Sequence, residues 1–218
     1  MVSTDRAVRV GSRRGEPVRD ADFFRRWMAA AAAAVEREAD RLTELDSPIG
    51  DADHGSNLLR GFTAVLAALD AEAPAAPGAV LQLAGRTLIS TVGGASGPLY
   101  GTLLRRTGKE FGDAAEVSDT ELRKALYAGV AAVAQLGGAA PGDATMLDAL
   151  VPGVTALSTS YRAAGDAAEH GALATVPMQA RKGRASYLGE RSIGHQDPGA
   201  TSSALLLGAL ADVADGVL

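Results

Sequence analysis

Three aspartates that follow a predicted helix carry the residue types most suggestive of chemistry in this chain. Asp46, Asp51 and Asp53 fall within eight residues, in a stretch that also contains Pro48 and Gly50. Carboxylates this close together repel one another, so a compensating cation is expected beside them. Because all the ligand atoms would be oxygens, a hard cation such as magnesium or calcium is favoured over zinc.

The spacing of this loop does not fit an EF-hand calcium site. Counted from Asp51, the fifth position is Gly55, where an Asp or Asn ligand is needed, and the twelfth is Phe62 instead of Glu. Magnesium is commonly held by a few carboxylates together with the phosphates of a substrate. The loop therefore favours a magnesium site, and the alternative is a solvated helix-capping loop that holds no metal.

The residues directly after the aspartates favour a phosphate next to this metal. His54, Gly55, Ser56 and Asn57 stand where the next predicted helix begins. The first N–H groups of a helix lack partners within the helix, and the positive end of its dipole attracts anions. Three carboxylates and a nucleoside diphosphate carry about −3 each, and two Mg²⁺ ions would offset most of that charge.

Two glycine-rich loops farther along the chain could line the same pocket. Residues 93–98 are small enough for a backbone to approach a ligand closely, although a plain helix–helix turn would look the same. In residues 142–148, Asp143 is predicted to cap a helix, and Met146 either joins the core or covers an adenine face. The chain contains no P-loop, no Rossmann glycine motif and no nucleophile elbow.

The last polar segment combines a basic cluster with a helix start. Residues 181–184 contain two arginines and a lysine, which could clamp phosphate charge or could form a solvated face. Asp197 and Pro198 occupy the positions expected for the N-cap and first residue of a final helix. The same turn could also line a nucleotide pocket.

Composition narrows the class of protein. The chain has 218 residues, 47% apolar and 22% charged, which suits one globular domain. Cysteine is absent, which excludes disulfides and thiolate chemistry and fits a cytoplasmic location. We expect no signal peptide and no membrane span. A net charge of −5, few aromatics and cations clustered only at Arg13, Arg14 and residues 181–184 argue against nucleic-acid binding.

Alanine dominates the chain and predicts an all-α fold, because it is the best helix former. Residues 1–19 are predicted to be a flexible leader and residues 20–218 a single domain, with a connector at residues 74–78. In a bundle, alternate loops lie at one end, so the polar loops would gather there. The predicted helices cover residues 22–45, 55–70, 79–92, 99–111, 119–136, 145–160, 161–175 and 199–217.

Taken together, these motifs resemble the DhaL family of dihydroxyacetone kinase subunits. The likeness extends over about residues 20–218 and is carried by Asp46 with residues 50–55, 93–102, 142–148 and 182–200. The last of these segments is the longest and most specific. One departure is Ala144, where the family often has lysine, so a positive charge near the pocket is missing.

The resemblance implies an antiparallel eight-helix barrel with the nucleotide, ADP or ATP, at one end. It implies that Asp46, Asp51 and Asp53 hold two Mg²⁺ ions that bridge to the diphosphate and act in catalysis together with Arg184. It also implies nucleotide contacts from His54, Gly55, Ser56, Asn57, Ala95, Ser96, Gly137, Met146, Arg184, Asp197, Pro198 and Gly199.

The resemblance further implies a phosphotransferase that works with partners. A DhaK subunit would hold dihydroxyacetone, and a DhaM subunit would rephosphorylate tightly held ADP in versions that use phosphoenolpyruvate. Two alternatives remain at this point: an ATP-dependent kinase subunit for another small ketose, or a non-catalytic nucleotide-binding regulator. A homodimer is also left open.

Overall fold

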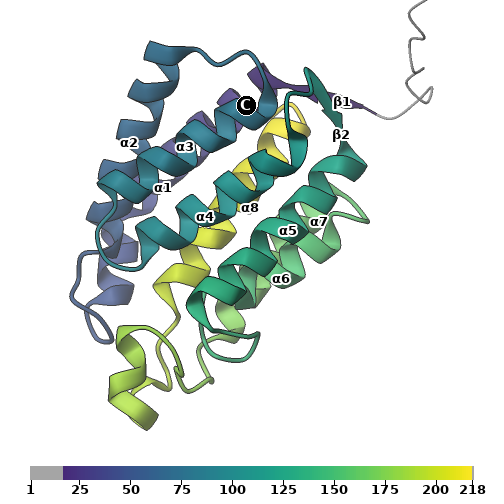
Figure 1. Cartoon of the computed structure of the whole chain (residues 1–218). Coiled ribbons are helices and arrows are strands. Elements are labelled where there is room, and N and C mark those ends of the chain that lie inside the picture. The colour runs from purple at the N-terminus through teal and green to yellow at the C-terminus, as the bar shows by residue number, and fades with distance from the viewer. Residues whose placement is uncertain (1–16, 218) are drawn as a thin grey trace, which may run out of the picture.

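The computed structural model describes residues 17–217, and helices dominate this part of the chain (Figure 1). Two short strands, β1 (Val18–Asp20) and β2 (Glu116–Ser118), and one 3₁₀ helix, η1 (Arg184–Ser192), accompany the α-helices. The α-helices are α1 (Ala21–Asp46), α2 (His54–Glu72), α3 (Pro77–Thr91), α4 (Ser96–Phe111), α5 (Asp119–Gly137), α6 (Leu147–Ala156), α7 (Tyr161–Ala174) and α8 (Pro198–Ala214).

The α-helices form a closed ring. Each helix packs against the next one in the chain, and α8 packs against α1 (Figure 1). The indole Nε1 of Trp27 on α1 donates a hydrogen bond of 2.9 Å to the carbonyl of Leu206 on α8, which ties the first helix to the last. The predicted all-α, antiparallel eight-helix architecture is thereby confirmed.

The apolar face of the first helix forms much of the core, as its periodicity predicts. Phe23, Phe24, Trp27 and Met28 are buried and lie in one continuous cluster with residues from all the other α-helices. Asp20 precedes this helix, and its carboxylate accepts a hydrogen bond of 2.9 Å from the N–H of Phe23. The side chain therefore caps the helix at the point where the core begins.

Two pairs of glycines set the spacing between α3 and α4. A Cβ atom built on Gly85 would lie 2.6 Å from the carbonyl oxygen of Gly101, and the reverse substitution meets the Gly85 carbonyl at 2.6 Å. Gly78 and Gly108 form a second reciprocal pair at the same distance. Each pair lies two helical turns from the other, so the two antiparallel backbones touch along their length. This contact fixes the loop that joins the two helices.

We predict that Gly85→Ala destabilises the protein by about 1–3 kcal/mol, because the added methyl group meets backbone atoms that cannot move aside. Gly208→Ala is the matched control, since nothing lies within 4 Å of a Cβ atom at that helical glycine. The control is expected to be neutral or to stabilise by up to about 1 kcal/mol. Urea unfolding of both variants measures the difference, and equal stabilities would contradict the close-packing argument.

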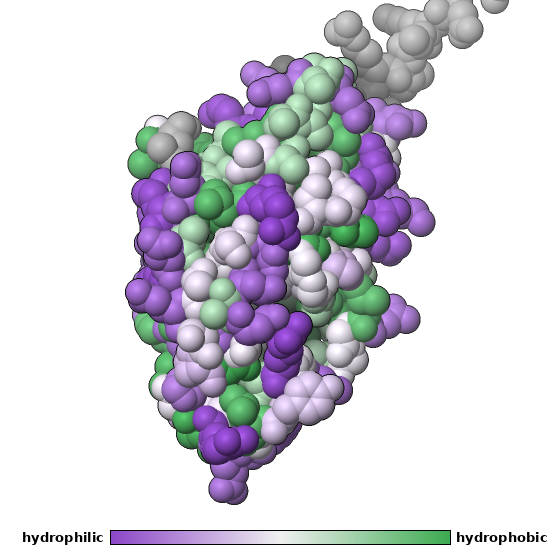
Figure 2. Space-filling model, turned by 90° about the vertical axis from the view of Figure 1, so that its left-hand side faces the viewer, coloured by the Kyte–Doolittle hydropathy of each residue, from purple (hydrophilic) through white to green (hydrophobic). Residues whose placement is uncertain are grey.

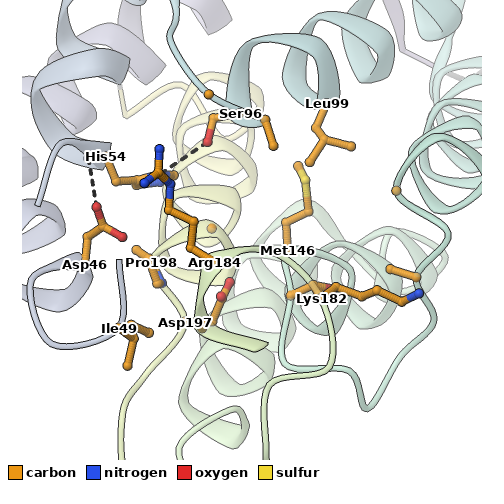
Figure 3. A pocket seen from close by; sticks show the side chains of 18 of the residues that line it. Asp46, Ile49, His54, Ser96, Leu99, Met146, Lys182, Arg184, Asp197 and Pro198 are labelled. Atoms are coloured by element: carbon orange, nitrogen blue, oxygen red, sulfur yellow. Dashed lines mark hydrogen bonds between the residues drawn. The ribbon is translucent and has the colours of Figure 1, made fainter. Parts of the chain in front are cut away.

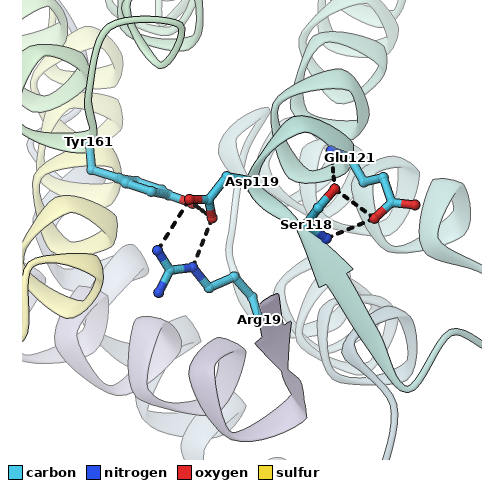
Figure 4. Close-up of polar contacts among 5 residues, drawn as sticks. All are labelled: Arg19, Ser118, Asp119, Glu121 and Tyr161. Atoms are coloured by element: carbon cyan, nitrogen blue, oxygen red, sulfur yellow. Dashed lines mark hydrogen bonds and ion pairs between the residues drawn. The ribbon is translucent and has the colours of Figure 1, made fainter. Parts of the chain in front are cut away.

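A small sheet and a polar cluster hold the end of the ring where α1 and α5 begin (Figure 4). β1 pairs with β2 in antiparallel register, with Arg19 opposite Val117. Arg19 makes a two-pronged ion pair with Asp119, at 2.8 and 3.3 Å, and the hydroxyl of Tyr161 donates to the same carboxylate at 2.5 Å. The cluster thus joins β1, α5 and α7.

This sheet was not expected from the sequence. Val18 and Arg19 fall inside the predicted leader, yet they belong to β1, because the pairing partner lies about a hundred residues away and leaves no local signal. Residues 1–16 of the predicted leader, including Arg13 and Arg14, lie outside the described residues.

Several predicted helix boundaries need correction. Pro77 was assigned to a connector, but it is the first residue of α3, where its missing N–H costs nothing. Asp143 was predicted to cap a helix, whereas its carboxylate accepts from the N–H of Ala140 within a loop. The helix after it, α6, is shorter than predicted. The predicted start of α5 is confirmed, because Ser118 and Glu121 form a reciprocal capping box.

The surface gives no sign of a membrane-spanning segment. Among the described residues, no helix is long and apolar enough to cross a bilayer. On the face shown in Figure 2, hydrophilic residues are interspersed with smaller apolar groups. Scattered exposed apolar side chains are normal for a protein surface.

Candidate functional site

The polar loops meet at the end of the ring opposite the small sheet. They enclose a cavity of about 280 Å³. Its walls come from the loop between α1 and α2, the loop between α3 and α4, the segment from Gly137 to Leu147, and the turns around η1 and the start of α8. Segments far apart in the chain therefore converge on one pocket, as the predicted alternation of loops requires.

The three predicted carboxylates come together in this pocket. One oxygen from each of Asp46, Asp51 and Asp53 lies within 4.8 Å of the others. Asp46 ends α1, and its Oδ2 accepts hydrogen bonds from the N–H groups of Asp53 (3.0 Å) and His54 (3.3 Å). A side chain from one helix therefore caps the start of the next helix, and its charge lies at the positive end of the α2 dipole.

The loop between α1 and α2 is shaped to bring these carboxylates together. A Cβ atom on Gly50 would lie 1.9 Å from Oδ1 of Asp46, so only glycine leaves room for that oxygen. Ala52 adopts a φ of +58°, a left-handed conformation that alanine rarely takes. Asp53 occupies the N-cap position of α2 without a side-chain cap hydrogen bond, so its carboxylate is available to a ligand.

The last polar segment adds basic side chains to the pocket wall, and one of them faces the carboxylates. The guanidinium of Arg184, at the start of η1, lies 2.9 Å from Oδ2 of Asp51. Lys182 also lines the cavity. The carboxylates of Asp46, Asp51 and Asp53 outnumber these two cations in the cavity wall, so the wall carries excess negative charge.

The donor set fits a hard divalent cation. Within the described residues, Asp46, Asp51 and Asp53 form the one group of three or more potential ligand side chains close enough to share an ion. All their donor atoms are carboxylate oxygens, which magnesium and calcium prefer. The excess negative charge and the free carboxylate of Asp53 indicate that a bound cation would relieve repulsion in the loop.

We predict that Gly50→Ala weakens Mg²⁺-dependent ligand binding at this site by at least about tenfold, because the methyl group displaces the Asp46 carboxylate. Gly50 does not have a positive φ, so alanine is otherwise compatible with its backbone. Isothermal titration with Mg²⁺ and ADP measures the effect, with Gly208→Ala as the control. Wild-type affinity in Gly50→Ala would show that the Asp46 oxygen is not a ligand.

His54 links this charged half of the pocket to the helices behind it. Its Nε2 lies 2.9 Å from Oγ of Ser202 on α8, and its Nδ1 lies 3.3 Å from Oγ of Ser96 on α4. Burial lowers the pKa of the imidazole, and the nearby charges of Asp46 and Asp53 only partly oppose this shift. The ring is therefore neutral at neutral pH in the metal-free protein.

The opposite half of the pocket is mostly apolar, although Lys182 lies on this side (Figure 3). In Figure 3, Asp46 and His54 lie on one side, and Leu99 and Met146 lie on the other. Met146 is buried in the core cluster, as its core interpretation predicted, and it also lines the cavity. The remaining apolar lining comes from Val133, Ala139, Ala144 and Leu147. An apolar group would fit this half, and an anionic group would fit the other half only together with a bound cation.

Asp197 caps α8 at the edge of the pocket. Its Oδ2 accepts a hydrogen bond of 2.6 Å from the N–H of Ala200, and its own N–H donates to the buried hydroxyl of Thr175. Removal from water raises the pKa of the Asp197 carboxyl to about 7. The charges of Asp148 and Asp46 raise it further, while the Ala200 and Gly199 N–H groups oppose the shift.

We predict that the metal-free protein loses stability as the pH rises from about 4 to about 7, because Asp197 holds a proton in the folded state that it releases when unfolded. The contribution is present below the ordinary aspartate pKa and is lost as the pH passes the raised one. Asp197→Asn keeps an acceptor for the Ala200 N–H and removes this titration. Unfolding followed against pH in EDTA should give a flatter profile for the variant, and identical slopes would contradict the assignment.

Comparison with known proteins places the chain in a family. The model of the DAK2 domain matches residues 48–212. The chain is 45% identical to the ADP-binding subunit DhaL of the phosphoenolpyruvate-dependent dihydroxyacetone kinase of Escherichia coli, over 85% of this chain and 93% of that one. It belongs to the DhaL family of dihydroxyacetone kinase subunits. The resemblance and the phosphotransferase class predicted from the motifs are thereby confirmed.

Other relatives are a subunit of similar length and two kinases that are much longer than this chain. The chain is 43% identical to a DhaL subunit of Listeria innocua, over 88% of this chain and 94% of that one. It is 38% identical to a D-erythrulose kinase of Mycolicibacterium smegmatis, over 85% of this chain but only 33% of that kinase. The dihydroxyacetone kinase of C. freundii in complex with AMP-PNP and Mg²⁺ matches with a TM-score of 0.71 and 26% identity, covering 97% of this chain and 37% of that one.

Most of the residues that the DhaL resemblance implied lie on the wall of the pocket. Among them, Gly55 and Ser56 do not: the Cα of Gly55 faces the carbonyl of Ala39 on α1, and Ser56 is exposed with its hydroxyl bonded to the Asp53 carbonyl. The residues on the wall are Asp46, Asp51, Asp53, His54, Asn57, Ala95, Ser96, Gly137, Met146, Arg184, Asp197, Pro198 and Gly199.

The structure adds residues that motif spacing did not select. Leu99, Tyr100 and Lys182 also line the cavity, and Ser202 lies directly behind His54. Lys182 stands in the basic segment recognised from the sequence, but nothing local distinguished it from its neighbours. Ala144, which departs from the usual lysine of the family, is buried in the wall with a φ of +54°. The cations of the wall are therefore Lys182 and Arg184.

Proposed function

We propose that this chain is the ADP- and Mg²⁺-binding subunit of a dihydroxyacetone kinase and that it carries the phosphoryl group to a ketose held by a partner. One observation supports this most directly. Three carboxylates meet at the N-terminus of α2, at the charged end of a pocket whose other end is apolar. A nucleotide has the same division between its base and its phosphates.

In this proposal the base lies against Met146 and Leu99, and the phosphates lie at the start of α2. The first N–H groups of α2 and its dipole favour the phosphate charge. Asp46, Asp51 and Asp53 would hold two Mg²⁺ ions, which would neutralise the diphosphate and the carboxylates. The E. coli relative is named as ADP-binding, and the C. freundii neighbour was solved with AMP-PNP and Mg²⁺.

Arg184 would add positive charge where the phosphoryl group moves. Its guanidinium lies beside Asp51, so a phosphate held by a metal ion at Asp51 would lie close to it. In the transfer, the bond from the γ-phosphorus to the bridging oxygen of ADP breaks, and a bond to the ketose hydroxyl oxygen forms. The hydroxyl proton would pass to a base on the partner. Positioning and charge neutralisation would supply most of the rate enhancement.

The ketose site is proposed to lie on a DhaK-like partner. The chain spans about a third of the erythrulose kinase and of the C. freundii kinase, so those proteins contain a large additional part. The DhaL relatives are named as subunits, and that of E. coli as part of a phosphoenolpyruvate-dependent enzyme. We therefore favour a DhaM-like phosphoprotein donor that recharges bound ADP.

We predict that Asp53→Ala lowers Mg²⁺-dependent ADP affinity by at least about 100-fold, because a ligand is lost at the metal. The fold should be little affected, since the Asp53 side chain makes no cap hydrogen bond in α2. Asp70→Asn, an exposed carboxylate near the other end of α2, is the matched control. Titration calorimetry with ADP, in Mg²⁺ and in EDTA, measures both.

Normal ADP affinity in Asp53→Ala would overturn the metal assignment. The route of phosphorylation is tested separately with the wild-type chain. Retention of ADP through gel filtration and its phosphorylation by a phosphoprotein donor would support the phosphoenolpyruvate-dependent route. Rapid exchange with free ATP, followed by turnover of erythrulose with a ketose-binding partner, would instead support the ATP-dependent alternative. If no such partner gave turnover, the result would favour the third alternative, a non-catalytic nucleotide-binding regulator.

A further inference from the structure

A chain of buried hydroxyl groups lies behind the charged half of the pocket. The hydroxyl of Tyr100 on α4 lies 2.6 Å from Oγ of Ser202 and 2.9 Å from Oγ of Ser203, both on α8. Ser202 in turn contacts Nε2 of His54 on α2, and Nδ1 of His54 contacts Ser96 at the start of α4. Tyr100, Ser202 and Ser203 are each at most 2% exposed.

The positions of the protons in this network follow from hydrogen-bond accounting. Oγ of Ser202 also lies 3.0 Å from the carbonyl of Pro198 and 3.2 Å from that of Gly199, and both carbonyls can only accept. The Tyr100 hydroxyl lies 3.1 Å from the same Gly199 carbonyl but only 2.6 Å from Ser202. If Ser202 donates to a carbonyl and Tyr100 donates along its shorter contact, Ser202 accepts from Tyr100 and from the N–H on Nε2 of His54, so its proton and both lone pairs are used. The opposite tautomer of His54 would leave one Ser202 lone pair without a donor.

This accounting also orients Ser96. With the ring proton on Nε2, Nδ1 of His54 is an acceptor, and the hydroxyl of Ser96 donates a hydrogen bond to it. Ser96 is the first residue of α4 and lines the cavity, as His54 does. A buried polar group that is fully bonded holds its neighbours in one arrangement, while a partly bonded one does not.

We propose that Tyr100 and Ser202 are positioning residues, which hold His54 in its Nε2–H tautomer and thereby fix His54 and Ser96 on the nucleotide-binding wall. The network joins α2, α4 and α8 at the end where the phosphates are proposed to lie. Its role in affinity rests on the proposed function of the pocket, while the tautomer of His54 does not depend on that function.

The first test is the ring proton of His54 in the ligand-free full-length chain. The chain has only three histidines, so nitrogen-correlated proton spectra can resolve them. We expect a slowly exchanging proton on Nε2 of His54, identified by its loss in His54→Gln. Ser202→Ala should shift or broaden this signal, because the proton then loses its hydroxyl acceptor and keeps only the Pro198 carbonyl nearby. A proton on Nδ1, or an unchanged signal in Ser202→Ala, would overturn the proposal.

The second test is ADP affinity in Mg²⁺. Tyr100→Phe and Ser202→Ala should each weaken binding by about three- to tenfold, since each removes hydrogen bonds from the buried groups that face the substituted side chain. The double variant should bind ADP about as weakly as the more affected single variant, because both changes break one network. Additive losses in the double variant would count against a shared role.

Thr107→Val is the matched control. Thr107 is a fully buried hydroxyl two turns farther along α4, and it bonds only to the carbonyl of Leu103 in its own helix. Its loss should cost comparable stability while leaving the His54 proton and ADP affinity unchanged. Equal loss of affinity in Thr107→Val would reduce the effect to stability and overturn the positioning role. If wild-type protein bound no ADP, the proposed function would fail. The proton spectrum would still show whether Ser202 holds His54 in its Nε2–H tautomer.

Discussion

The mutual repulsion of three carboxylates is the constraint on which the rest of this structure depends. Asp46, Asp51 and Asp53 bring ligand oxygens within 4.8 Å of one another, and such a cluster persists only if its surroundings offset the charge. Two features do so in the described protein: the start of α2 donates N–H groups to Asp46, and Arg184 pairs with Asp51. Gly50 leaves the space that the Asp46 oxygen needs.

Closure of the helical ring makes this arrangement possible. The indole of Trp27 reaches α8, and the glycine pairs bring α3 and α4 into backbone contact. The end where α1 and α5 begin is held by β1, β2 and the ion pair of Arg19 with Asp119. Rigid packing at that end leaves the other end free to consist of loops, which carry the charged and apolar halves of the pocket.

The buried hydroxyl network positions part of the pocket wall through groups that carry no charge. His54 lies next to the carboxylates in sequence, but its ring is held by side chains from α4 and α8. Among the described residues, no buried side-chain nitrogen or oxygen lacks a hydrogen-bond partner. Such full pairing in a low-dielectric setting favours one geometry over many, as a binding site for a flexible, charged ligand requires.

The sequence by itself determined the features that depend on short-range spacing. The helical composition, the capping box at Ser118, the helix start after Asp53 and the family motifs could all be recognised from neighbouring residues. The tertiary structure alone decided that Asp46 caps α2, that Arg184 reaches Asp51 and that Tyr100 meets Ser202. It also placed Val18 in a strand and Asp143 away from a helix cap. The Arg184–Asp51 and Tyr100–Ser202 contacts and strand β1 form only when distant segments meet as the ring closes. The Asp46 cap depends on how its own loop folds. Periodicity and turn chemistry along the chain carry no record of them.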